Sequence, residues 1–218
     1  MYLKIMKNST TKMVSNKEKK QLETPRLTRD DWLDAAFMAV VDGGFDQARV
    51  LVIAEKLGVT RGSFYWHFSD HADLITSLLK RWEMREIELD KRLQADDTDD
   101  PKADLERLLD AALAHAGVDL ENIRFELALR GLGRRDATVA SMLVGIDAGR
   151  MNLFEQKFLR LTGDTKTAGE LAVLFYLVIA GGHQALSRPT SPPQAKEFLK
   201  GIIASYLINQ QSRPGTRG

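Results

Sequence analysis

The densest group of chemically capable side chains lies in the run "GVTRGSFYWHF", from Gly58 to Phe68. Its eleven residues include four aromatic rings, an arginine, a histidine and two aliphatic hydroxyl groups. A soluble protein rarely exposes so much aromatic surface unless something binds there. The donor fork of Arg61 matches O6 and N7 of guanine, and Tyr65 and His67 can hydrogen-bond phosphate oxygens. The run therefore has the side chains of a DNA-reading surface, although a structural helix corner with all its aromatic rings buried would contain the same residues.

The sequence before this run predicts two helices. Thr28 is a suitable N-cap, and the apolar residues of 32–40 follow it at the spacing of one helix face. The "DGG" of 42–44 ends that helix, because glycine raises the cost of ordering the chain and permits a left-handed turn. Apolar residues within 50–57 recur at helical spacing and predict a second, short helix. Gly58 ends it at a position where only glycine adopts a positive φ at low cost.

The run itself predicts a third, very short helix. Thr60 is its expected N-cap, and Phe64 and Phe68, four residues apart, form its inward stripe. Asp70 then begins a long fourth helix that continues to about Gln94. Two short helices joined by a glycine turn are a helix-turn-helix, in which the second helix presents its N-terminal side chains to base edges in the major groove.

Charge is distributed unevenly along the chain, although the net charge is only +1. Residues 1–29 carry eight Lys or Arg against two acidic residues, whereas residues 30–100 carry eight against sixteen. The start is also poor in apolar residues, so we expect residues 1–26 to be a disordered basic arm. Such an arm contacts DNA, or it is a solubilising tail or a misassigned start, and the sequence leaves these possibilities open.

Composition points to a soluble protein of the cytoplasm. No cysteine is present, which excludes disulfides and suits a reducing compartment. The N-terminus lacks the apolar run of a signal peptide. The most apolar run, residues 171–182, is far too short to cross a bilayer, so we expect no association with a membrane.

The remainder of the chain predicts a second helical region, so the expected fold class is all-α. An acidic break at 94–103 separates it from the front end. We expect solvation to account for the acidic residues at helix ends and in the break at 96–100. No strand-like alternation follows. The predicted helices cover about 102–116, 120–131, 137–162, 167–187 and 194–210. We expect residues 213–218 to be a disordered tail.

The segment "IAEKLGVTRGSFYWHFSDHADLI" closely resembles the DNA-binding signature of the TetR family of transcriptional repressors, and the likeness extends over about residues 28–80. It implies a helix-turn-helix domain at 27–72, a connecting fourth helix at 70–94, and a ligand-binding and dimerisation domain at 95–212. It also implies a regulator rather than an enzyme, without catalytic residues, cofactor or metal. Such a protein would be a repressor that binds a palindromic operator on double-stranded DNA as a homodimer and is released by a small apolar ligand. A helical protein–protein module, or an activator without small-molecule control, is the alternative.

The resemblance assigns DNA contacts residue by residue. The base-reading positions of the family are matched by Arg61, Gly62 and Ser63. Contacts to the DNA backbone or to base edges are matched by Tyr65, Trp66 and His67. The second helix begins near the phosphates with Arg49 and Val50, and the starts of the next two helices are occupied by Thr60 and His71. A lysine is usual in the family where His71 stands. A histidine is mostly neutral at pH 7, so its phosphate contact is in doubt, although backbone N–H groups at the helix start can still hold a phosphate. The four-residue spacing of His67 and His71 is interrupted between two helices, which argues against a metal site.

The resemblance also suggests roles for the second region. The segments of 167–210 are apolar over most of their surface, which predicts either packing within one chain or pairing with a second copy. Apolar residues with a few polar ones among the middle helices suggest a ligand cavity, although ordinary core packing explains them equally well. The candidate ligand-binding residues are His115, Phe125, Met142, Phe154, Phe175, Tyr176 and His183.

Overall fold

A computed structural model describes residues 27–118, 120–186 and 195–209, and within those ranges the fold is all-α with no strand, as expected. The helices are α1 (Arg29–Gly43), α2 (Val50–Lys56), α3 (Arg61–Phe64), α4 (His71–Ala95), α5 (Pro101–Val118), α6 (Leu120–Gly133), α7 (Ala137–Thr162), α8 (Thr165–Leu186) and α9 (Ala195–Ile203). A 3₁₀ turn (Phe45–Gln47) follows α1, and a π-helical segment (Ala204–Asn209) follows α9. The expected arm (1–26) and tail (213–218) lie outside the described residues.

The first helix begins and ends where the sequence predicts. The backbone N–H of Asp31 donates to Oγ1 of Thr28 (3.2 Å), and the N–H of Thr28 donates back to Oδ2 of Asp31 (2.6 Å). This reciprocal pair satisfies two donors that a helix start otherwise leaves without partners. The helix ends at Gly43, and Gly44 adopts a φ of 80°, which confirms the stop predicted from the glycine pair.

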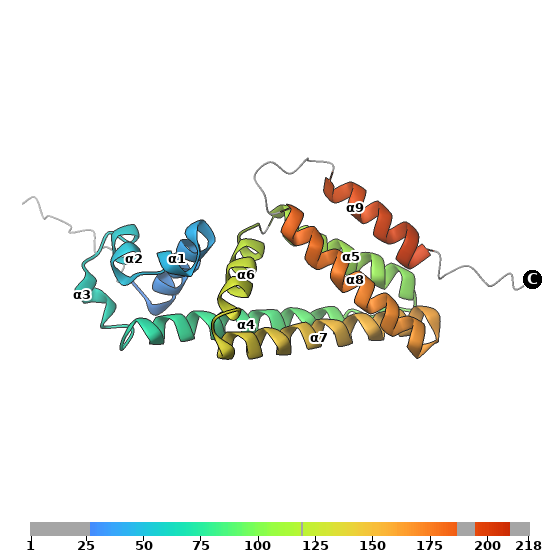
Figure 1. Cartoon of the computed structure of the whole chain (residues 1–218), viewed down its shortest axis with the longest axis horizontal. Coiled ribbons are helices and arrows are strands. Elements are labelled where there is room, and N and C mark those ends of the chain that lie inside the picture. The colour runs from blue at the N-terminus through green and yellow to red at the C-terminus, as the bar shows by residue number, and fades with distance from the viewer. Residues whose placement is uncertain (1–26, 119, 187–194, 210–218) are drawn as a thin grey trace, which may run out of the picture.

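Helices α1 to α3 pack around aromatic side chains. Phe64 at the end of α3 and Phe68, four residues further on, are buried, and the Trp32 ring meets Phe64 edge-on at 5.4 Å between ring centres. Gly58 has a φ of 67°, which confirms the left-handed turn between α2 and α3. Helix α3 thus lies at one end of the molecule, at the left of Figure 1.

The apolar core of this end continues into the rest of the chain. Phe125 on α6 stacks against Phe37 on α1 at 4.7 Å, and it also meets Phe45 and Trp82. α4 runs along α7, as Figure 1 shows, so one long helix belongs both to the α1–α3 end and to the C-terminal bundle. A displacement of α4 therefore moves side chains in both parts.

A second apolar cluster holds α5, α7, α8 and α9 together. Phe175 of α8 is fully buried and meets Phe154 and Phe158 of α7 edge-on, at 4.9 and 5.7 Å between ring centres. α9 lies against α5 and α8. Gly182 of α8 permits that contact, since a Cβ there would lie 2.6 Å from Cδ2 of Leu199.

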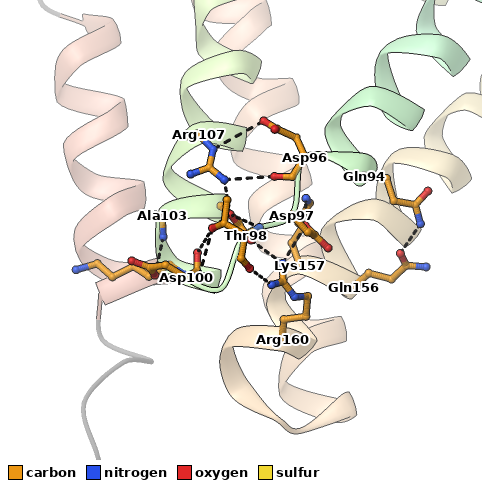
Figure 2. Close-up of polar contacts among 12 residues, drawn as sticks. Gln94, Asp96, Asp97, Thr98, Asp100, Ala103, Arg107, Gln156, Lys157 and Arg160 are labelled. Atoms are coloured by element: carbon orange, nitrogen blue, oxygen red, sulfur yellow. Dashed lines mark hydrogen bonds and ion pairs between the residues drawn. The ribbon is translucent and has the colours of Figure 1, made fainter.

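The connection between α4 and α5 is fixed to α7 by ion pairs, which corrects the expectation that solvation explains its acidic residues (Figure 2). Asp104 is buried, and its carboxylate accepts hydrogen bonds from Arg160 of α7 (2.6 Å) and from Thr98 (2.7 Å). Burial alone would raise the pKa of Asp104, but the bonds from Thr98, Arg160 and Arg107 outweigh it and hold the pKa far below its usual range. Asp97 also pairs with Arg160, at 2.9 Å. The far end of α4 is therefore anchored.

Helix α8 agrees with the predicted helix of about 167–187 and extends beyond its most apolar run, residues 171–182, at both ends. By length and composition alone, the helical stretch Thr165–Ala185 is long and apolar enough to cross a membrane, which the shorter run by itself is not. Its inner side contacts α7 and α5, where Leu171, Ala172 and Phe175 are buried. Its outer side is also apolar, but Leu177 there is exposed, so only one side of the helix is covered by the rest of the described chain.

Candidate functional site

The surface of α3 exposes the side chains suited to bind DNA. Arg61 and Gly62 are exposed at its first turn, and Tyr65 and Trp66 follow just beyond it. Trp66 is 80% exposed, so the run is not a corner with all its rings buried. Nη2 of Arg61 lies 3.3 Å from the Tyr65 hydroxyl, which holds the guanidinium over the helix. A guanidinium, a phenol ring and an indole ring thus share one solvent-facing surface.

Arg29 at the start of α1 holds this surface to α4. Its Nη1 donates to the backbone oxygen of His67 (2.7 Å), and its Nη2 donates to Oδ1 of Asp73 (3.2 Å) and to Oγ of Ser77 (2.5 Å). The guanidinium also lies over the Phe68 ring, 4.2 Å from its centre. Because one side chain contacts the end of the α3 turn and the first turns of α4, α3 is fixed relative to α4. The sequence pattern marks Arg29 only as one of the basic residues of the N-terminal segment, so this role was missed.

Three predicted DNA contacts are placed differently from expectation. The hydroxyl of Ser63 is buried and has no hydrogen-bond partner among the described residues, so in this rotamer it does not face bases. The His67 ring is half-buried beside Trp32, with 6.4 Å between the ring centres. His71 donates from Nε2 to the carbonyl oxygen of Ala48 (2.7 Å). That bond holds the start of α4 to the loop before α2. The sequence suggested only a phosphate contact for His71, by comparison with the lysine that is usual at this position.

The remaining predicted contacts lie at helix starts. Arg49 is exposed at the N-cap position of α2, and its Nε donates to the backbone oxygen of Asp46 (2.8 Å). Val50 is half-buried against the α1–α3 core. Thr60 occupies the N-cap position of α3, as predicted, but its side chain makes no capping bond and remains exposed.

A cavity of about 240 Å³ lies among α4, α5, α6, α7 and α8. Apolar side chains form most of its wall, including Leu89, Leu108, Leu153, Phe154 and Ile179. Its polar lining comprises Glu86, Asp90, Asn122, Glu126, Arg130, Arg150, Tyr176, His183 and Gln184. Apolar walls with a few placed polar groups are typical of small-molecule sites in helical bundles.

Two arginines on the cavity wall are fully engaged with acidic partners. Arg150 donates to Glu86 (2.8 Å) and to both oxygens of Glu126 (2.9 and 3.0 Å). Arg130 forks onto Asp147 (2.7 and 3.0 Å) and also reaches Glu126 (2.7 Å). Burial would raise the pKa of Glu126, but the charges and hydrogen bonds of Arg150 and Arg130 outweigh it and lower the pKa to about 2. The network therefore stays ionised and links α4, α6 and α7.

Asp90 of α4 stands apart from this network. It lines the cavity, yet it makes no hydrogen bond or ion pair with any described residue. Burial raises the pKa of Asp90 to about 6, the charges of Glu86 and Glu126 add to the rise, and Arg150 opposes it. The cavity thus contains one carboxylate that no described side chain pairs with.

Residues 33–78 match the family model described as bacterial regulatory proteins, tetR family. The match shows that residues 33–78 resemble the N-terminal region of tetR-family regulators. Among curated relatives, the HTH-type transcriptional regulator TtgR of Pseudomonas putida is 33% identical over 87 residues, which are 40% of this chain and 41% of TtgR. The chain thus aligns with about two fifths of the length of TtgR and of AcrR from Shigella flexneri.

Solved structures share the fold over nearly the whole chain. A transcriptional regulator from Saccharomonospora viridis, solved in complex with choline, has a TM-score of 0.67 at 17% identity, covering 83% of this chain and 97% of its own. The regulator FadR from Bacillus subtilis, solved in complex with stearoyl-CoA, has a TM-score of 0.62 at 18% identity, covering 83% of this chain and 98% of its own. At such identities the likeness shows that the fold of these two proteins is shared and that it includes the C-terminal bundle.

The cavity brings together some of the candidate ligand residues and leaves out others. Phe154, Tyr176 and His183 line it, and Nε2 of His183 lies 3.0 Å from the backbone oxygen of Ala112. Phe175 is buried in the core behind Phe154. The structure places Phe125 and Met142 in the other apolar cluster, beside α1. The His115 side chain lies outside the described residues.

The acidic side of the cavity was not predicted, although α4 carries a signal for it. Residues 74, 78 and 82 form the buried stripe of α4 at four-residue intervals, as Leu, Leu and Trp. The next members of the same stripe are Glu86 and Asp90. Charged residues on the inward face of a helix require partners or a cavity.

Proposed function

We propose that this chain is a TetR-family transcriptional regulator that binds double-stranded DNA through α3 and represses transcription until a small molecule binds its cavity. The observation that carries this proposal is the exposed surface of Arg61, Gly62, Tyr65 and Trp66, held to α4 by Arg29. In this proposal residues 27–72 form the DNA-binding domain, α4 is the connector, and the protein acts in the cytoplasm.

The proposed active form is a homodimer formed through α8 and α9. Their outward side is apolar and exposed; Leu177 is 57% exposed and Phe198 is 71% exposed. The other exposed apolar residues of this face are Val173, Leu174, Ile202 and Tyr206. Pairing with the same face of a second copy would bury this surface, including the outer side of α8 that could otherwise suggest a membrane span. Two-fold symmetry then calls for a palindromic operator with half-sites about 34–36 Å apart.

Ligand control follows from the position of the cavity. Glu86, Leu89 and Asp90 of α4 line it, and the same helix is joined to α3 by Arg29. A ligand changes DNA affinity only if it binds one arrangement of α4 better than another, and typical couplings of about 1–3 kcal/mol correspond to roughly 5- to 150-fold in affinity. Choline and stearoyl-CoA, bound by the two neighbours above, differ greatly in size and charge, so the fold alone does not select the ligand class.

Selection of bound sequences from random duplex DNA tests DNA binding directly. The selected site should be palindromic, and binding should weaken steeply with salt, because phosphate contacts release counterions. Arg61→Ala should reduce affinity for the selected site and relax one base-pair preference. Lys80→Ala, an exposed change further along α4, is the control and should bind as the unchanged protein does. No enrichment, or enrichment without salt dependence, would instead favour a protein–protein module.

A further inference from the structure

The charges around the cavity do not balance. The carboxylates of Glu86, Glu126 and Asp147 contact the guanidinium groups of Arg130 and Arg150, so three negative charges meet two positive ones. Asp90 adds a fourth carboxylate, and it has no contact with either arginine. When Asp90 is ionised, the site thus carries an excess of negative charge beside an apolar wall, an arrangement that costs free energy unless a cation occupies it.

The arginines are not available to an anionic ligand. Each guanidinium already contacts at least two carboxylates, and Nη2 of Arg130 also lies 3.4 Å from the hydroxyl of Tyr176 on α8. An acid entering the cavity would have to displace one of these short contacts and would also meet the charge of Asp90. Electrostatics therefore disfavours carboxylate or phosphate groups.

The rest of the lining suits the organic part of a cation. Leu93, Leu108 and Ile179 offer aliphatic contact, while Phe154 and Tyr176 offer aromatic rings. Ring faces attract organic cations, including quaternary ammonium groups, through the ring quadrupole. A small molecule with one positive charge and an apolar body matches both sides of the site.

We propose that the ligand of this cavity is a lipophilic organic cation whose charge pairs with Asp90. The inference rests on the proposed ligand control and specifies its chemistry.

Asp90 is also reachable from outside the bundle. A groove between α4 and α7 is lined by Asp90, Gly145 and Gly149 together with Ile87 and Leu153. A Cβ at Gly149 would lie 3.4 Å from Oδ2 of Asp90, so the absence of a side chain keeps the approach to this carboxylate open. A cation can therefore meet Asp90 at the edge of the cavity without first crossing its apolar interior.

The charged groups around Asp90 predict how binding depends on pH. These groups are Glu83, Glu86 and Lys91 of α4, Glu126 and Arg130 of α6, Asp147 and Arg150 of α7, and Tyr176 and His183 of α8. Protonation of Asp90 removes the charge that attracts the ligand, so the binding of a cation weakens as pH falls. Because the pKa of Asp90 is raised to about 6, affinity should fall by roughly tenfold from pH 7 to pH 5.

Calorimetric titration of the full chain with matched probes tests the proposal. Benzyltrimethylammonium keeps its charge at every pH, neopentylbenzene is its neutral isostere, and 4-phenylbutyrate is a related anion. The cation should bind at least roughly tenfold more tightly than either at pH 7, the factor expected for one ion pair in a partly dry site. Asp90→Asn should abolish that preference and flatten the pH dependence, whereas Glu88→Gln, an exposed change on the same helix, should leave both intact.

Two results would overturn the proposal. One is a cation that binds no more tightly than its neutral isostere, which includes the case in which neither binds. The other is a preference that survives Asp90→Asn. If the isostere or the anion binds and releases DNA while the cation does not, ligand control stands and only the ligand class is wrong. DNA binding by the ligand-free chain, measured alongside, reports separately on the proposed regulatory function.

Discussion

Replacing Asp90 with asparagine should stabilise the ligand-free protein. The folded chain raises the pKa of this carboxyl from 3.8 to about 6, so folding opposes its ionisation. A shift of about two pKa units corresponds to about 3 kcal/mol, because each unit is worth about 1.36 kcal/mol. Asp90 also borders an open groove, and solvent screening there reduces the effect to about 1–2 kcal/mol. Asp90→Asn removes the ionisable group, so it should raise the free energy of unfolding by that amount at pH 7.

The pH dependence identifies the cause of this gain. Because the pKa of Asp90 is higher in the folded chain than in the unfolded chain, ionisation of this carboxyl favours unfolding. The protein therefore bears no such penalty well below pH 3.8, and loses stability as the pH rises to about 6. The difference between Asp90→Asn and the unchanged protein should therefore be small near pH 4, grow up to pH 6, and be nearly constant above it. Urea unfolding at several pH values measures this difference, with Glu88→Gln as the control. An unchanged or lower stability of Asp90→Asn at pH 7 would refute the reasoning, and so would a gain that is equal at pH 4.

Three further substitutions test other parts of the structure. Ser63→Ala should change DNA affinity by less than about twofold, because its hydroxyl is turned into the core, whereas Arg61→Ala should cost about 1–3 kcal/mol of binding free energy. Fluorescence anisotropy on the selected operator compares the two variants. Equal losses of affinity would mean that Ser63 rotates toward the DNA. Leu177→Glu should yield a folded monomer by sedimentation, but Ile203→Glu should unfold the chain, since Ile203 is only 1% exposed and lies in the core. Asp104→Asn should lower the free energy of unfolding by about 3 kcal/mol near pH 7, because it removes the carboxylate that pairs with Arg160. This loss should shrink in strong acid, where the carboxyl of the unchanged protein is also protonated. A loss of stability that persists in strong acid would indicate that packing, not charge, is responsible.

The sequence was most informative where structure depends on near neighbours. The cap at Thr28, the turn at Gly58 and the inward pair Phe64 and Phe68 each depend on residues a few positions away, and the structure confirms all three. Long helices of the C-terminal region were also predictable, because apolar spacing along one helix does not depend on which helix packs against it.

The cavity was less predictable because it depends on which helices meet. Apolar spacing marked both Phe125 and Phe154 as inward, yet only Phe154 reaches the cavity. The network around Arg150 joins residues more than twenty positions apart, so no local pattern reveals it. The change from Trp82 to Glu86 along one stripe of α4 was the available signal, and it becomes meaningful once inward acidic residues are treated as possible ligand contacts.

The anchored end of α4 gives this helix the geometry of a lever arm. From the ion pairs at Asp97 back to Asp90 is about 10 Å of helix, and back to His71 is about 39 Å, at about 1.5 Å per residue. If α4 rotates about that anchor, a displacement at Asp90 is therefore multiplied about fourfold at the end that carries α3. A ligand that moves Asp90 by about half an ångström would shift α3 by about 2 Å, and in a dimer the two shifts combine across the operator.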